Sequence, residues 1–357
     1  ESLLNRYYLF HLALIFAMSA LLASATPPAG QQLYRRGIWG APVILLLAFY
    51  LIWSTNLRVI HADMAYKRGE AYTNQGAWQP AIVAYQHAIA LAPYEDFYYL
   101  SLAKSYADYG ISLKEQTERD ILFNQATNLL KHAQAINPLN TDHTANLARL
   151  HSAWAQNTQD GTMKDQRARL ADEYFSRAVV LSPQNSTLWL EWALLYMNVF
   201  RDRQEAYWRL RKASELDPLY DRIHAALGDY YAQTALNTQD QQQKETLTRQ
   251  AAEEYRLALK YANPGEVSLQ YVYRNALASA YVQLGEFEMA IPIFEQALQL
   301  IPSSADRWMI QETIGRLYAK LEKRELALTY LTKAMLNAPQ DQRERIQGLI
   351  NQLQTQP

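Results

Sequence analysis

One pattern of small and aromatic residues recurs seven times between about Ala62 and the C-terminus. Each copy has an alanine, a large apolar or aromatic residue and a second alanine at spacings of four and three, as in Ala81-Tyr85-Ala88. Residues three and four apart share one face of a helix, and small residues on that face let two helices approach closely. A proline follows each trio and ends the second helix; the prolines are Pro93, Pro138, Pro183, Pro218, Pro264, Pro302 and Pro339. The pattern therefore predicts an all-α array of seven helical hairpins.

The stretch GEAYTNQGAWQPAIVAYQHAIALAP, from Gly69 to Pro93, resembles the tetratricopeptide repeat at almost every signature position. The resemblance implies a right-handed α-solenoid of about seven tetratricopeptide repeats over residues 61–340. Residues 341–357 then form a C-terminal capping helix and tail. Upstream of each trio, a small residue precedes an aromatic residue by three positions, as in Gly69-Tyr72 and Ala103-Tyr106. One copy departs from this second pattern, because Ala148 is followed three residues later by His151.

The spacing between this aromatic position and the next alanine takes three values. It is nine residues in the first, sixth and seventh repeats, ten in the fourth, and 20 in the second, third and fifth. Eleven added residues make about three helical turns, so they can lengthen both helices without rotating their packing faces. We expect taller hairpins in these three repeats; growth of the loops alone is the alternative. Ser112 and Glu115 predict a capping box in one of them.

Two uncharged apolar stretches precede the repeats, at residues 7–26 and 38–57. Each holds 20 residues, and a helix of that length spans the hydrocarbon core of a bilayer. We expect two transmembrane helices, a hairpin within residues 1–60, and an integral protein of a bacterial inner or plasma membrane. A buried hairpin and a signal peptide ending near Ala25 are the alternatives. Basic residues flank both sides, so the side occupied by the repeats stays open.

Composition argues against several classes of function. The formal charge is −1, whereas a general nucleic-acid binder usually carries a basic excess, so no nucleic-acid partner is expected. Cysteine is absent, and no Gly-rich phosphate loop, HExxH pair or GxSxG turn occurs. We therefore expect no catalytic residue, metal site or cofactor within this chain. The histidines are interpreted as packed or solvated, with a functional role considered for His11 inside the first apolar stretch. Asn185 is interpreted as a helix N-cap.

By resemblance to the family, the first helix of each repeat lines a concave groove that binds a protein partner. The positions expected to face it are Tyr66, Glu70, Lys104, Arg149, Asp229, Asn275 and Arg316. The Lys and Asn clamp that some family members use for acidic C-terminal peptides is not reproduced, because Tyr66 and Glu70 occupy its first two positions.

A second resemblance concerns nearly the whole chain. EDFYYLSLAKSYA (Glu95–Ala107) and INPLNTDHTANLARLHSAWA (Ile136–Ala155), after two apolar spans, resemble the C-terminal region of bacterial O-antigen ligase-like membrane proteins. This implies transfer of surface glycans by a longer parent protein, with no catalytic residue in this part. Glu1 is then an internal residue of that protein; the trimmed terminus of a precursor is the alternative. Two functions stay open: a membrane-anchored scaffold belonging to such a transferase, and a stand-alone structural subunit of a membrane complex.

Overall fold

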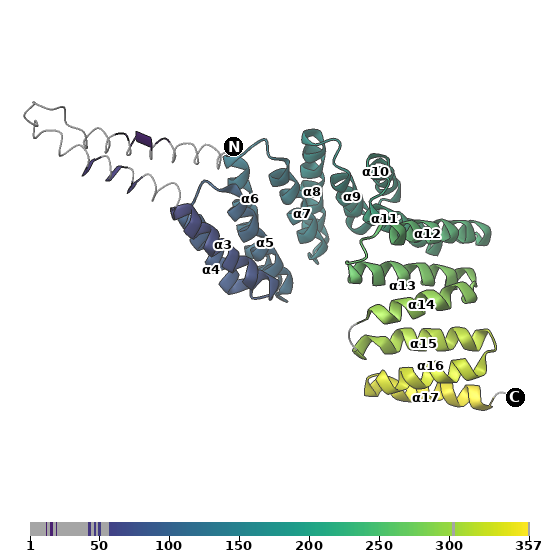
Figure 1. Cartoon of the computed structure of the whole chain (residues 1–357). Coiled ribbons are helices and arrows are strands. Elements are labelled where there is room, and N and C mark those ends of the chain that lie inside the picture. The colour runs from purple at the N-terminus through teal and green to yellow at the C-terminus, as the bar shows by residue number, and fades with distance from the viewer. Residues whose placement is uncertain are drawn as a thin grey trace, which may run out of the picture. The chain divides into compact units, whose positions relative to one another are not determined.

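The computed structural model describes residues 57–301 and 304–355, with isolated positions between 12 and 50. Over these two ranges the chain forms 15 α-helices and one π-helix, and no strand (Figure 1). No helix among them is both long and apolar enough to cross a bilayer. The predicted spans, 7–26 and 38–57, lie almost entirely outside the described residues.

The chain divides into two compact units, Glu1–Leu181 and Ser182–Pro357. The helices of the first unit form three antiparallel pairs; they are α3 (Arg58–Asn74), α4 (Trp78–Leu91), α5 (Asp96–Ser112), α6 (Gln116–Ile136), α7 (Thr141–Gln156) and α8 (Gly161–Leu181).

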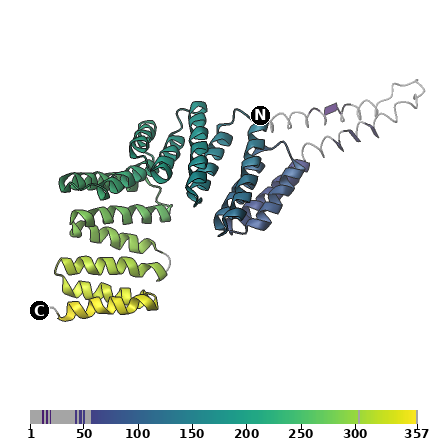
Figure 2. The same cartoon turned by 180° about the vertical axis from the view of Figure 1, so that it is seen from behind.

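The second unit continues the pattern of pairs and adds a last single helix (Figure 2). Its elements are α9 (Ser186–Leu195) with η2 (Tyr196–Phe200), α10 (Arg203–Leu216), α11 (Asp221–Leu236), α12 (Gln241–Tyr261), α13 (Val267–Leu284), α14 (Phe287–Leu300), α15 (Ser304–Lys320), α16 (Arg324–Asn337) and α17 (Gln340–Thr355). The seven predicted hairpins are therefore present. The second helix of each ends two or three residues before a proline of the repeat, as the pattern predicts.

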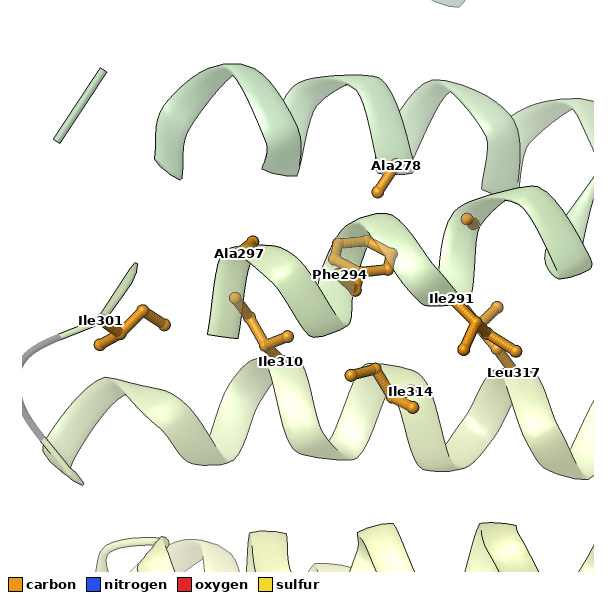
Figure 3. Packing of buried hydrophobic residues seen from close by; sticks show 9 residues of the cluster. Ala278, Ile291, Phe294, Ala297, Ile301, Ile310, Ile314 and Leu317 are labelled. Atoms are coloured by element: carbon orange, nitrogen blue, oxygen red, sulfur yellow. The ribbon is translucent and has the colours of Figure 1, made fainter. Parts of the chain in front are cut away.

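The two alanines of each trio and the large residue between them form the core, as expected. In the sixth hairpin Ala290 and Ala297 are fully buried, and Phe294 is 4% exposed. Figure 3 shows Phe294 directed toward Ala278 of α13, while Ile310 of α15 approaches α14 from the other side. Each helix therefore packs on its two neighbours, so burial is distributed along each unit.

The added residues of the three enlarged repeats are helical. Their second helices, α6, α8 and α12, have 21 residues each, against 14 in α4, α10, α14 and α16. The first helices also end about one turn later, since α5 runs six residues beyond Tyr106 whereas α3 runs two beyond Tyr72. The prediction of taller hairpins is confirmed, and growth of loops alone is wrong.

The ends of these tall hairpins are fixed by polar side chains. In the first unit Arg167 is buried over the ring of Trp154, hydrogen-bonds Thr158 and pairs with Asp120 at 3.0 Å. The Trp154 indole also donates to Asp120, at 2.6 Å. The second and third hairpins are thus joined at their tall ends by a buried cation.

The helix caps differ in part from expectation. The capping box at Ser112 and Glu115 is wrong: the Ser112 hydroxyl donates to the carbonyl of Tyr109, and Glu115 makes no side-chain cap bond to α6. In another enlarged hairpin, Asp240 is the N-cap of α12, and its side chain accepts from the backbone of Gln242 and Gln243. The N-cap at Asn185 is confirmed, because its side chain accepts from Thr187 and Leu188 at 3.1 and 3.4 Å.

His151 takes the aromatic position of its repeat. Its ring is 4% exposed and stacks between Trp154 and Tyr174, with centroids 5.8 and 5.6 Å away. Burial, with a smaller contribution from Lys131 and Arg167, lowers the pKa of His151 to about 4. A neutral imidazole therefore serves as a flat packing group, which confirms a packing role for this histidine.

Candidate functional site

An apolar hollow in the first unit lies between the first helices of its second and third hairpins. This cavity, of about 320 Å³, is bounded by α5 and α7, with Leu130 of α6 contributing to its lining. Its lining is mainly aliphatic, and polar groups come from Ser101, Lys104, Asp108, Asn146 and Arg149. We call it the apolar cavity.

A second hollow adjoins it on the side of the first hairpin. This polar cavity, of about 270 Å³, is lined by Tyr66, Glu70, Thr73, Asn74, Tyr85, Ser101 and Lys104. Ser101 and Lys104 line both cavities, so the two form one groove across the first three hairpins.

Ion pairs and hydrogen bonds along the helices hold the polar side chains of this groove. The Tyr66 hydroxyl donates to Glu70 at 3.0 Å, and the Lys67 ammonium lies 2.6 Å from the same carboxylate. The hydrogen bond from Lys67, with help from that of Tyr66, lowers the pKa of Glu70. Lys104 pairs with Asp108 at 2.7 Å. Both pairs join residues one turn apart, so each helix presents its charged groups in a fixed position.

The aromatic side chains at the polar cavity are fixed by packing against one another. The ring of Tyr66 packs against Tyr85, Phe97 and Tyr98 at centroid distances of 5.2–5.5 Å. The Tyr98 hydroxyl donates to Asp63 at 2.5 Å. Burial is the main cause of a raised pKa at Tyr66, so its hydroxyl stays protonated at neutral pH and acts as a donor.

Four of the seven predicted groove residues are therefore brought together in the first unit: Tyr66, Glu70, Lys104 and Arg149. The other three lie in the second unit and line neither cavity. Asp229 accepts a hydrogen bond from the Tyr255 hydroxyl at 2.7 Å, Arg316 pairs with Glu312 at 2.6 Å, and Asn275 is half-buried on α13.

Sequence reasoning missed five polar residues of the groove, namely Thr73, Asn74, Ser101, Asp108 and Asn146. Each lies three or four residues from a predicted groove residue on the same helix. Because such residues share one face of a helix, the helical period could have indicated them. Asn146 accepts from the Arg149 guanidinium at 2.9 Å and directs it along α7.

Comparison with known proteins agrees with this architecture. The tetratricopeptide repeat family model matches residues 272–304 and 310–341. No curated protein matches the chain. Human IFIT1, in a dimer determined with m7Gppp-AAAA, is 17% identical, with a TM-score of 0.50 over 82% of this chain and 62% of that one.

Structures of two bacterial proteins are also similar. A thermophilic TPR protein of Thermus thermophilus is 20% identical, with a TM-score of 0.47 over 60% of this chain and 98% of that one. PilF of Pseudomonas aeruginosa is 21% identical, with a TM-score of 0.45 over 69% of this chain and 98% of that one. None of these matches is to an O-antigen ligase-like protein. Residues 272–304 and 310–341 thus match the tetratricopeptide repeat, and each unit is an all-α solenoid of helical hairpins of this kind.

Proposed function

We propose that the chain is a protein-interaction scaffold and that the groove across its first three hairpins binds a peptide segment of a partner. The observation that carries this proposal is the continuity of the polar and apolar cavities through Ser101 and Lys104. Together they offer a recess for an apolar side chain and, beside it, hydrogen-bonding groups for the neighbouring residues.

The chemistry of the groove favours a peptide with an aliphatic side chain next to an acidic one. The apolar cavity is lined by residues such as Leu100, Leu130 and Leu150. At its rim are the cations Lys104 and Arg149, and a carboxylate of the partner would compete for them with Asp108 and Asn146. The exchange is favourable at Arg149, where a carboxylate of the partner would replace the neutral amide oxygen of Asn146 and make the hydrogen bond an ion pair.

Selection from a random peptide library tests the proposal. We expect enriched peptides to pair an aliphatic with an acidic residue. Tyr66→Ala and Arg149→Ala should each lower their affinity by about 2 kcal/mol, because tyrosine and arginine are common binding anchors. The matched control is Arg256→Ala, which removes an arginine that pairs with Glu253 and lines neither cavity. Peptides that bind the two groove variants as tightly as the wild type would place the binding surface elsewhere.

We further propose that residues 7–57 anchor the scaffold in a membrane, on the strength of the two uncharged 20-residue stretches. The full chain should stay with membranes through alkaline carbonate washing, since burial of two such helices far exceeds ionic attachment. Its appearance in the carbonate supernatant would contradict the anchor. The resemblance to O-antigen ligase-like proteins adds no residue to the groove, so the proposal is confined to partner binding.

A further inference from the structure

The fourth hairpin contains one residue more than its short counterparts. In the other short hairpins a backbone N–H after the turn donates to the carbonyl of the aromatic residue five positions earlier, as Ala77 does to Tyr72 at 2.9 Å. In the fourth, Asp202 donates to Tyr196, six positions earlier, at 3.1 Å. The extra residue lies in the π-helix η2, and such single π-turns are frequent at functional sites.

A cavity opens beside this π-turn, within the second unit. Its volume is about 680 Å³, inside the usual range for small-molecule sites. One wall consists of Met197, Phe200 and the turn 201–203, and the other is formed by Tyr230 and Gln233 on α11. We call it the π-turn cavity.

Two cations in this cavity have no partner within the described part of the chain. Arg201 and Arg203 are both exposed, and neither guanidinium makes a hydrogen bond or ion pair there. The carboxylate between them, Asp202, is engaged as the N-cap of α10 and accepts from the backbone of Glu205 at 3.1 Å. The cavity is therefore equipped for an anion.

Each wall of the π-turn cavity also carries an aromatic ring that is held by packing. Tyr230 stacks on Tyr207 with centroids 5.0 Å apart and planes 24° apart. Phe200 packs on Tyr196 at 4.9 Å. Rings held in this way give an organic group a rigid surface at little cost in side-chain entropy.

We propose that the π-turn cavity binds a phosphate monoester with an aromatic or apolar organic group. A phosphate dianion carries three terminal oxygens and can accept from both guanidinium forks. A carboxylate has two oxygens and is satisfied by a single arginine. The organic group then rests on Phe200, Tyr230 and Met197.

Titration calorimetry of the full chain with phenyl phosphate tests this site. We expect saturable binding that weakens as salt concentration rises. Inorganic phosphate lacks the organic group and benzoate lacks the third oxygen, so each should bind about tenfold more weakly or worse. Absence of saturable binding of phenyl phosphate up to about 10 mM would overturn the proposal, as would equal binding of benzoate or of inorganic phosphate.

A pair of substitutions at one turn position separates binding from folding. Arg201 and Glu322 both follow the aromatic residue of a short hairpin and have positive φ angles, 56° and 58°, where glycine is favoured. Arg201→Gly and Glu322→Gly should therefore both raise the Tm. Only Arg201→Gly should weaken the binding of phenyl phosphate, by about tenfold. Equal affinity of the two variants, with both folded, would exclude Arg201 from the site and overturn the proposal.

Discussion

The guanidinium of Arg345 on α17 donates to both carboxylate oxygens of Glu312 on α15, at 2.6 and 2.7 Å. Glu312 is 7% exposed and also accepts from Arg316 of its own helix. The last helix is thus attached to the first helix of the seventh hairpin by a nearly buried carboxylate. Ile346 and Ile350 of α17 are buried beside this pair, against Leu331 and Ala334 of α16.

We expect Arg345→Ala to lower the free energy of unfolding by about 1.5–2 kcal/mol, because the buried carboxylate loses its bidentate partner while keeping Arg316. Urea unfolding measures the loss. The control is Arg256→Ala, whose exposed pair with Glu253 should contribute under about 0.5 kcal/mol. Similar losses in the two variants would show that burial of Glu312 adds nothing to the pair.

A pH-dependent contribution is expected from His224. Its Nδ1 lies 2.7 Å from Glu254 and its Nε2 lies 2.9 Å from the carbonyl of Pro218, so both partners are acceptors. Burial opposes the charged ring, but the Glu254 and Pro218 hydrogen bonds, with Asp221 nearby, outweigh it and raise the pKa of His224 above its ordinary 6.5.

Because the pKa is raised on folding, this stabilisation is complete below pH 6.5 and is lost as the pH rises through the folded value. His224→Gln should therefore destabilise the chain more at pH 5.5 than at pH 9. The measurement is urea unfolding of both proteins at the two pH values. A difference that is constant with pH, or larger at pH 9, would contradict a charged His224.

Two glycines within helices should respond to alanine in opposite directions. A Cβ at Gly228 would lie 2.5 Å from the ring of Tyr255, which is fixed by its hydrogen bond to Asp229. Gly228→Ala should cost about 1–3 kcal/mol by overpacking. A Cβ at Gly348 meets nothing within 4 Å, so Gly348→Ala should stabilise α17 by about 0.5–1 kcal/mol.

Thermal unfolding of the two alanine variants side by side checks this prediction. If both variants are less stable than the wild type, the prediction for Gly348→Ala is wrong, since nothing near Gly348 would account for the loss.

Replacement of Glu322 by glycine should stabilise the seventh hairpin. The positive φ of this residue, 58°, costs about 1 kcal/mol for a side chain with a Cβ, and Gly76 and Gly285 occupy the same turn position of the first and sixth hairpins. We expect Glu322→Gly to raise the free energy of unfolding by about 0.5–1 kcal/mol. Glu325→Gly, inside α16, is the control and should lower it by a similar amount. The test is again urea unfolding.

Much of the helical array was predictable because helix packing leaves a short-range signal. Alanine and an aromatic residue at spacings of three and four specify which faces meet, and the trio at Ala290, Phe294 and Ala297 is buried as expected. The caps were less predictable. Ser112 has the right chemistry for an N-cap, but α5 extends through it, so its hydroxyl bonds back to Tyr109 within the same helix.

The groove was predictable only in part, for a geometric reason. The repeat pattern predicts which face of each first helix is directed toward the groove. Tyr66, Lys104 and Arg149 on these faces do line the cavities. Whether a cavity forms depends on how closely neighbouring hairpins approach. The ten-residue spacing of the fourth repeat likewise signals an extra residue, but not that a π-turn would absorb it.

The helical lengthening of the enlarged hairpins implies that the height of a hairpin comes in discrete increments. Seven residues added to a second helix make nearly two full turns, so Ala126 of α6 faces the core as Ala81 of α4 does. The eleven added residues should then be removable from one hairpin, or transferable to another, without a change in which faces of the helices pack together. A single added residue has no such freedom, since it turns the helix by about 100° and must be accommodated by a local change of winding.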